Sequence, residues 1–285
     1  MSYKNENMKM IELHENGLDI RFRIRENGVV ELADFSSQEV KKAIMEPKED
    51  ICYPAVEIHR SGTGNLNMHA YKNNINQSSV DFVYENHELK EQDGGKELEI
   101  VMVSPEKLKA VYHMRLFDGV PAVQTWTEVI NEGSEDQGLT YVSSFMYQGI
   151  SRGGEKPYYK KTDIYVPFNS WCCEAQWQKY DAETLNLNGI VVDGFNHQGY
   201  GLNRYCYSGK GTWSTCEYLP MGIAEDRETG ETYIFQIESS GQWLAEYGSA
   251  QGGNLYLALS GATEQEHGWY KNLKPGESFT TVPAG

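Results

Sequence analysis

Leu18-Asp-Ile-Arg-Phe-Arg-Ile-Arg25 alternates between apolar and charged residues, and Asn27-Gly28 follows it. Alternation with a period of two is typical of a β-strand that buries one face. An Asn-Gly pair favours a tight hairpin turn, because such a turn needs positive φ at both of its central residues. We therefore expect a β-hairpin whose second strand begins at Val29-Val-Glu-Leu32.

The same pattern recurs along most of the chain, whereas helical periodicity is almost absent. Asp93-Gly-Gly95 and Asp118-Gly119 are typical of turns between strands. Many strands joined by hairpins favour an antiparallel sandwich. Further strands are expected at 80–84, 97–101, 108–116, 123–130, 139–142, 232–238, 242–246 and 255–260.

The length of 285 residues suits one large all-β domain. We predict an all-β fold, a large antiparallel two-sheet β-sandwich with long irregular loops, as one domain over residues 1–285. Residues 169–180 and 185–201 are expected to be loops, and long loops in a compact domain are usually functional or interfacial. After the strand at 255–260 we expect a polar and aromatic loop, a turn at Pro275-Gly276 and a final strand.

Composition excludes several functions. The formal net charge of −16 argues against nucleic acid and against an anionic membrane surface as partners. No apolar run is long enough for a signal peptide or a membrane helix. The five cysteines are an odd number and two of them, Cys172 and Cys173, are adjacent, which is a poor disulfide framework. We therefore expect a reduced, cytoplasmic protein.

Motifs for catalysis or cofactors are weak. The seven histidines include no helical pair at metal-ligand spacing, and no phosphate-binding loop is present, so we predict neither a metal site nor a cofactor. Glycoside hydrolysis needs two facing carboxylates. Glu264 with Glu266, and Glu97 with Glu99, would each share one strand face. With 41 acidic residues such pairs arise by chance, and we interpret both as solvated strand edges.

Aromatic residues among Asn, Gln, Gly and Glu are more informative. Aromatic faces bind sugars, with amides and carboxylates holding the hydroxyl groups. Trp and Tyr are equally typical of contacts between domains or subunits. We favour the contact over the sugar site. The residues concerned are Trp171, Trp177, Tyr200, Tyr205, Trp213, Trp243 and Trp269.

A second polar cluster lies in residues 53–72, where an expected strand leads into a Gly-containing loop. This loop is either a plain solvated connection or a tip that reaches a ligand or a neighbouring subunit. The candidate substrate or interface residues from both clusters are His59, Arg60, Asn65, His69, Lys72, Trp171, Glu174, Trp177 and Trp269.

Several stretches together resemble the N-terminal domain of glycoside hydrolase family 36 α-galactosidases. They follow the order of that family over nearly the whole chain. The matching stretches are Tyr53-Pro-Ala-Val-Glu57, Leu98-Glu-Ile100 with His113, Thr127-Glu-Val-Ile-Asn-Glu-Gly133, Asn169-Ser-Trp171 with Glu174-Ala-Gln-Trp177, Tyr218-Leu-Pro-Met-Gly222, Phe235-Gln-Ile-Glu238 with Gly241-Gln-Trp243, Tyr256-Leu-Ala-Leu259 with Thr263-Glu-Gln-Glu-His267 and Trp269, and Pro275-Gly-Glu-Ser-Phe-Thr-Thr-Val-Pro283.

The resemblance implies a β-supersandwich that precedes a catalytic (β/α)₈ barrel, with a small β domain after the barrel. In that family, two barrel aspartates hydrolyse terminal α-galactosides with retention. Both would lie beyond Gly285, so no residue of this chain inherits a catalytic role. The implied partners are the barrel of the same protein and neighbouring subunits. The 169–177 segment is expected at an interface, and the 59–72 loop at a neighbour's active-site mouth.

Two other functions stay open at this point. An autonomous carbohydrate-binding module would use the exposed tryptophans directly. A complete sugar enzyme of the aldose-epimerase type, which has a related sandwich, would need a poised histidine and carboxylate.

Overall fold

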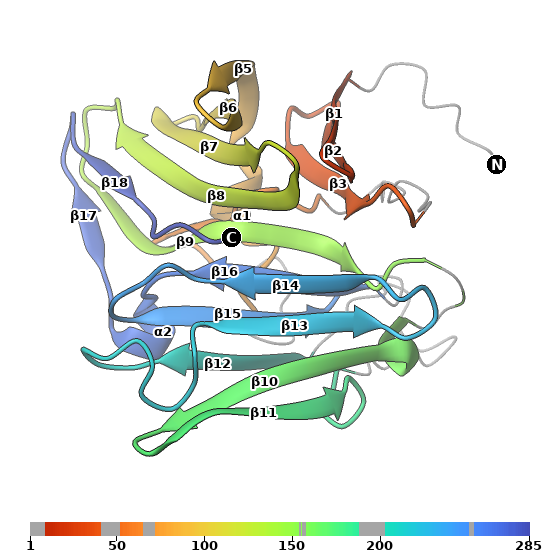
Figure 1. The fold of residues 1–285 in the computed structure, drawn as a ribbon. Coiled ribbons are helices and arrows are strands. Elements are labelled where there is room, and N and C mark those ends of the chain that lie inside the picture. Colours follow the sequence, from red (N-terminus) through yellow and green to blue (C-terminus); the bar gives the residue numbers. More distant parts are fainter. Residues whose placement is uncertain are drawn as a thin grey trace, which may run out of the picture.

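The computed structural model describes residues 9–40, 52–64, 72–153, 155, 158–187, 203–250 and 254–285 (Figure 1). Its strands pair antiparallel throughout, and they form four hydrogen-bonded sheets. Among the described residues, no helix is long and apolar enough to cross a membrane. The predicted all-β antiparallel architecture is confirmed.

The N-terminal hairpin forms as expected. Ile20 and Phe22 are fully buried, and Gly28 has a φ of 86° in the turn. The alternate residue Arg23 is also buried, because its guanidinium pairs with Glu31 at 2.6 Å. This three-stranded sheet has the order β1 (Lys9–Glu15), β2 (Leu18–Ile24) and β3 (Val30–Ser37).

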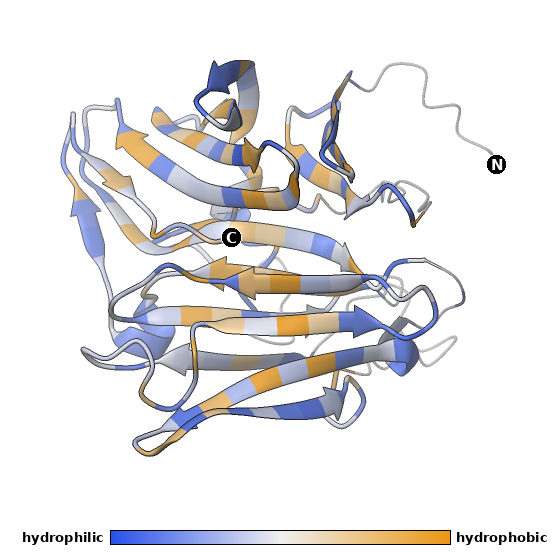
Figure 2. Ribbon diagram, viewed as in Figure 1, coloured by the Kyte–Doolittle hydropathy of each residue, from blue (hydrophilic) through white to orange (hydrophobic). Residues whose placement is uncertain are grey.

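A five-stranded sheet carries the longest alternating strands. In β6, Leu98 and Ile100 point into the core, whereas Glu97 and Glu99 lie on the opposite face. Figure 2 shows apolar and polar residues mixed along these strands rather than apolar strands throughout. The order is β18 (Ser278–Thr280), β8 (Val120–Asn131), β7 (Leu108–Phe117), β6 (Gly95–Val103) and β5 (Val83–Gln92).

The remaining strands form two further sheets. The six-stranded sheet has the order β12 (Arg204–Gly209), β15 (Trp243–Ser249), β16 (Leu255–Ser260), β9 (Gln137–Ile150) and β17 (Lys271–Leu273), with β4 (Ile58–Arg60) also paired to β9. The four-stranded sheet has the order β11 (Cys173–Asp181), β10 (Thr162–Ser170), β13 (Met221–Asp226) and β14 (Thr232–Gln236).

The last residues join two of these sheets. Ala284 bridges Thr125 of β8 and Ile237 just after β14, so the five-stranded and four-stranded sheets form one continuous layer. The six-stranded sheet packs against this layer. For example, Phe235 of β14 contacts the Tyr247 ring of β15, with 6.2 Å between centroids. The core between the layers is one large cluster of buried apolar side chains.

Two local predictions were wrong. Residues 169–180 are not a loop, because they form most of the β10–β11 hairpin, whose second strand is exposed on both faces and so lacks apolar alternation. Glu264 and Glu266 lie on the short helix α2 (Glu264–His267), not on a strand. The Thr263 side chain caps this helix by accepting a hydrogen bond from Glu266 N. The predicted loop at 185–201 falls mostly on 188–201, outside the described residues.

Two further short helical segments are α1 (Gln77–Val80) and a 3₁₀ turn (Tyr158–Lys161). All five cysteines have free thiols.

Candidate functional site

The described residues among those predicted in the 59–72 loop, His59, Arg60 and Lys72, are engaged within the chain. His59 on β4 is buried, with its ring 4.6 Å from the Tyr141 ring. The Arg60 guanidinium pairs with Glu106 at 2.9 Å and with Asp81 at 3.4 Å. Asn65 and His69 lie outside the described residues. A contact of this loop with substrate or a neighbouring subunit stays a prediction.

Lys72, the third described residue of that set, is also buried. Its ammonium donates a hydrogen bond to the Ser249 carbonyl at 2.9 Å and lies 5.7 Å from the centre of the Tyr256 ring. Burial lowers the pKa of Lys72 from its ordinary 10.5 to about 8, and the charge of Glu246 partly opposes this shift. Burial of the charged Lys72 ammonium at neutral pH therefore lowers the free energy of unfolding.

We expect Lys72→Met to remove a pH dependence of stability. Between pH 8 and pH 10.5 the unfolded chain holds more protons on Lys72 than the folded chain does, so this group stabilises the fold as pH rises. Relative to the variant, the free energy of unfolding of the natural chain should increase by about 2 kcal/mol from pH 7 to pH 9.5. Urea unfolding of both proteins measures this, and a pH-independent difference would contradict the assignment.

Two fully buried glutamates hold the segment that follows Lys72. Glu57 accepts hydrogen bonds from the backbone N–H groups of Ile75 and Asn76. Glu246 on β15 accepts from the backbone N–H and the side-chain amide of Asn73, each at 2.8 Å. Ile75 has a φ of 59°, which is rare for a β-branched residue. The buried carboxylates thus hold a strained backbone segment in place.

Glu246 is the centre of a larger polar cluster. Besides Asn73 it accepts hydrogen bonds from the Tyr256 hydroxyl and from the Arg204 guanidinium, the latter at 2.8 Å. Arg204 also donates to Glu266 of α2 at 3.2 Å. Every Glu246 oxygen therefore has donors within the chain, and the cluster links β12, β15, β16 and α2. We interpret it as structural.

Exposed tryptophans lie close together at the β10–β11 turn of the four-stranded sheet. Trp171, in the β10–β11 turn, is 82% exposed and Trp213 is 61% exposed. Their rings stack at 6.4 Å with an interplanar angle of 19°, and we call these two residues the tryptophan pair. Trp177 on β11 is 38% exposed, and the Glu174 carboxylate accepts from Cys172 N at 3.2 Å. Three of the predicted site residues thus share one hairpin.

Trp269 and Trp243 differ from this group. Trp269 packs on Phe279 at 5.1 Å and lines a small cavity of about 220 Å³ near β18. Trp243 is fully buried in the core and its indole N–H donates to the Ser214 carbonyl at 2.6 Å. Sequence composition did not separate these roles, and it did not identify Trp213 as the partner of Trp171.

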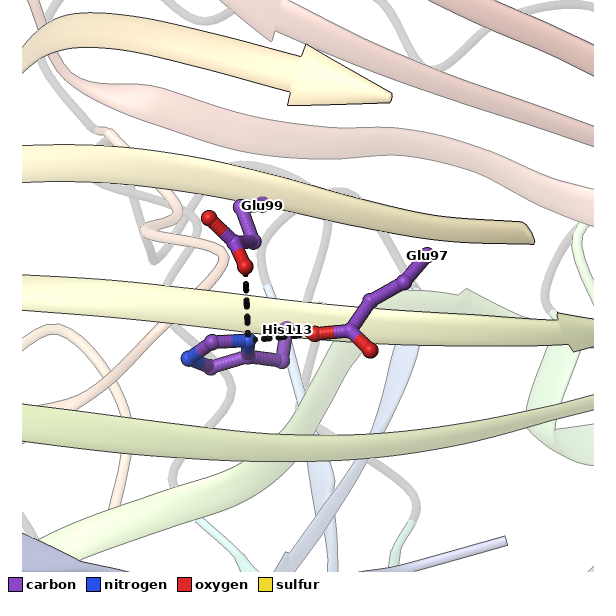
Figure 3. Close-up of side chains that lie close together, drawn as sticks. All are labelled: Glu97, Glu99 and His113. Atoms are coloured by element: carbon purple, nitrogen blue, oxygen red, sulfur yellow. Dashed lines mark hydrogen bonds and ion pairs between the residues drawn. The ribbon is translucent and has the colours of Figure 1, made fainter. Parts of the chain in front are cut away.

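A third cluster lies on the outer face of the five-stranded sheet. Glu97 and Glu99 of β6 share this face, as predicted, and His113 of β7 lies directly across from Glu99 (Figure 3). Their interpretation as a solvated strand edge was wrong, because β6 lies between β5 and β7 and Glu97 is buried. His113 Nδ1 is 2.8 Å from one oxygen of Glu97 and 3.9 Å from one oxygen of Glu99. The Trp126 ring of β8 stacks on the imidazole at 4.8 Å with an angle of 7°.

A cavity of about 410 Å³ lies between β3, β14 and β16. Its walls are mainly apolar, including Phe35, Phe145 and Leu257. Glu39 and Glu231 supply carboxylates, but no imidazole lines this cavity among the described residues.

No family model matches the chain, and no curated protein matches it. Solved structures do. α-Galactosidase AgaA of family 36 from Geobacillus stearothermophilus, in complex with stachyose, matches 97% of this chain over 40% of its own, at 15% identity and a TM-score of 0.72. The α-galactosidase AgaB from the same organism matches 99% of this chain over 40% of its own, at 13% identity and a TM-score of 0.70.

A galactose mutarotase-like protein from Clostridium acetobutylicum matches more weakly. It covers 100% of this chain and 97% of its own, at 13% identity and a TM-score of 0.54. At these identities the likeness concerns the fold. The resemblance inferred from sequence is confirmed at that level: this chain has the fold of one part of the family 36 α-galactosidases and spans about 40% of their length.

Proposed function

We propose that this chain is the N-terminal accessory domain of an α-galactosidase-like retaining glycoside hydrolase. In this role it packs on a catalytic barrel of the same protein and shapes the active-site mouth or a subunit interface. The observation that carries the proposal is the pattern of coverage: nearly all of this chain matches less than half of each enzyme. The remaining part of those enzymes has no counterpart among the 285 residues.

The tryptophan pair supports a docking role. Two large, stacked indoles that remain exposed are unusual on a surface that faces only water, and tryptophan is enriched at the energetic centres of interfaces. Strand β11 beside it is exposed on both faces. Burial of these side chains against another domain or subunit would remove a large apolar area from water.

In this proposal, catalysis takes place on another domain of the protein and not on this chain. Each oxygen of the buried carboxylates Glu57 and Glu246 accepts a hydrogen bond from within the chain, and the 410 Å³ cavity has no imidazole among the described residues of its walls. The α-galactoside substrate is therefore expected to react on the barrel. Purified alone, the chain should neither hydrolyse p-nitrophenyl α-galactoside nor accelerate the mutarotation of galactose, and turnover in either assay would overturn the proposal.

A second candidate has one specific observation in its favour. The galactose mutarotase-like protein is matched over almost its whole length, so this fold also occurs as a protein of about this size. An autonomous sugar-binding module or sugar enzyme would then use this chain alone. Titration with galactose, melibiose and raffinose separates the two functions, because saturable binding that is lost in Trp171→Ala favours the module.

We expect a double change, Trp171→Ala with Trp213→Ala, to weaken docking strongly. Removal of a central tryptophan commonly costs an interface about 2 kcal/mol or more. In a protein that joins this chain to the proposed catalytic barrel, α-galactosidase activity or subunit assembly should fall, while the thermal midpoint of this chain alone should change little. Tyr270→Ala, an exposed aromatic residue elsewhere, is the matched control. Equal effects of both variants would contradict a docking role for the tryptophan pair.

A further inference from the structure

We propose that Glu97, Glu99 and His113 form a binding site for a divalent transition-metal ion, with Zn²⁺ as the best fit. The three residues lie on neighbouring strands β6 and β7, on the outer face of the five-stranded sheet (Figure 3). One donor atom from each residue lies within 4.8 Å of the other two. This inference is independent of the proposed docking role.

The spacing of the donor atoms suits a small ion. Zn²⁺ bonds of about 2.0–2.2 Å in tetrahedral geometry place neighbouring ligand atoms roughly 3.4 Å apart. The distances from His113 Nδ1 to the facing oxygens of Glu97 and Glu99, 2.8 Å and 3.9 Å, lie on either side of that value. The two distances from the imidazole thus need to change by about half an ångström, and the two carboxylate oxygens, which lie within 4.8 Å of each other, need to approach by at most about 1.4 Å for one ion to bind all three donors.

The outer oxygens of both carboxylates are held by neighbours. The Gln92 amide donates to Glu97 Oε2 at 2.6 Å, and the Lys90 ammonium pairs with Glu99 Oε2 at 2.6 Å. The Oε1 atoms of both glutamates are the ones that face His113. Partners of this kind orient metal ligands in known sites, and their loss typically costs 10–100-fold in affinity.

The imidazole is also held in place. Trp126 lies opposite His113 in the β7–β8 pairing and stacks on its ring, which fixes the ring plane and directs Nδ1 towards the carboxylates. All three ligands are partly buried on the sheet face, with His113 and Glu97 more shielded than Glu99. A neutral imidazole with two carboxylates is a common Zn²⁺ set and leaves a fourth position for water.

The chemistry of this donor set distinguishes between ions. Mg²⁺ and Ca²⁺ take oxygen ligands and high coordination numbers, which an imidazole and two carboxylates on a flat sheet do not supply. The positive charges nearby are Lys90, on the far oxygen of Glu99, and Arg115, which lies opposite Glu97 in the strand pairing and donates to the Asp93 carbonyl at 3.3 Å. Neither cation contacts the oxygens that face His113.

The chain contains a matched control, a second imidazole near two carboxylates. His14 contacts Asp19 through Nδ1 at 2.7 Å and Glu12 through Nε2 at 4.0 Å. Its two carboxylates therefore lie at opposite nitrogens of the ring and do not converge on one point. If an imidazole near two carboxylates were sufficient for binding, this cluster would bind as well.

The test is calorimetric titration of ZnCl₂ into the untagged chain in which Cys172, Cys173 and Cys216 are changed to Ser, because exposed thiols bind zinc by themselves. We expect one saturable site that MgCl₂ does not occupy. His113→Gln and Glu99→Gln should each weaken it at least tenfold, Gln92→Ala about tenfold, and His14→Gln should leave it unchanged.

Near-ultraviolet circular dichroism without metal establishes whether each variant is folded. If His113→Gln does not fold, Glu99→Gln, which changes the more exposed ligand, tests the site in its place. Zn²⁺ should also raise the thermal midpoint of the chain but not that of the ligand variants. Three outcomes would contradict the proposal and leave the cluster as a surface ion-pair network. They are the absence of saturable binding, an unchanged affinity in both ligand variants, and an equal loss of affinity in His14→Gln.

Discussion

Glu246→Ala is expected to lower the free energy of unfolding by about 3–5 kcal/mol, because several buried donors lose their acceptor at once and each such loss costs about 1–3 kcal/mol. The change leaves the Arg204 guanidinium without its 2.8 Å carboxylate partner and frees two donors of Asn73. It also releases one end of the strained segment around Ile75. Chemical denaturation followed by circular dichroism measures the loss.

Glu266→Ala is the control for this prediction. Glu266 accepts from the same Arg204, at 3.2 Å, but its side chain is partly exposed on α2. Water replaces such a partner at little cost, so we expect less than about 1 kcal/mol. If the two substitutions cost the same, burial does not determine the role of Glu246, and the interpretation of this cluster as a structural centre is wrong.

The strands were predictable from the sequence where one face is buried and the other is exposed to solvent. In β6, Leu98 and Ile100 alternate with Glu97 and Glu99, and the sequence alone placed both glutamates on one face. It did not place His113 beside them, because the pairing of β6 with β7 depends on the turn and on cross-strand packing. The cluster on the outer face therefore needed the three-dimensional structure.

Prediction failed where the usual pattern is absent or was overlooked. Strand β11 is exposed on both faces, so it has no apolar alternation and resembled a loop. Helix α2 was missed although Thr263 and Glu266 have the Ser/Thr-x-x-Glu spacing of a helix start, a signal present in the sequence. The buried cluster of Lys72 and Glu246 joins residues far apart in the chain and left no local signal.

The tryptophans show the same limit. Trp171, Trp213 and Trp243 all occur among polar residues and glycines, and the sequence grouped them together. In the structure the first two are exposed and stacked, whereas Trp243 is fully buried on strand β15, which pairs on both sides with β12 and β16. Which tryptophan is buried is decided by tertiary contacts, for Trp243 those with the Tyr207 ring and the Ser214 carbonyl, and not by its sequence neighbours.

Trp243→Ala should therefore destabilise the chain by about 3–5 kcal/mol, as large-to-small changes of core aromatics do. The indole meets the Tyr207 ring edge-on at 5.8 Å and donates its N–H to Ser214. It also lies over Gly209, where an added Cβ would be 2.2 Å from the indole nitrogen, so Gly209→Ala is expected to be destabilising as well.

Trp213→Ala separates burial from residue type in this experiment. It removes the same side chain from an exposed position, so we expect a change in the free energy of unfolding of less than about 1 kcal/mol. Unfolding in urea, monitored by far-ultraviolet circular dichroism so that the lost fluorophore does not matter, measures both variants. If Trp243→Ala is as stable as Trp213→Ala, β15 does not pack in the core as described. The distinction between core and surface tryptophans would then fail. The proposed docking role of the exposed pair would lose its structural basis, because it depends on that distinction.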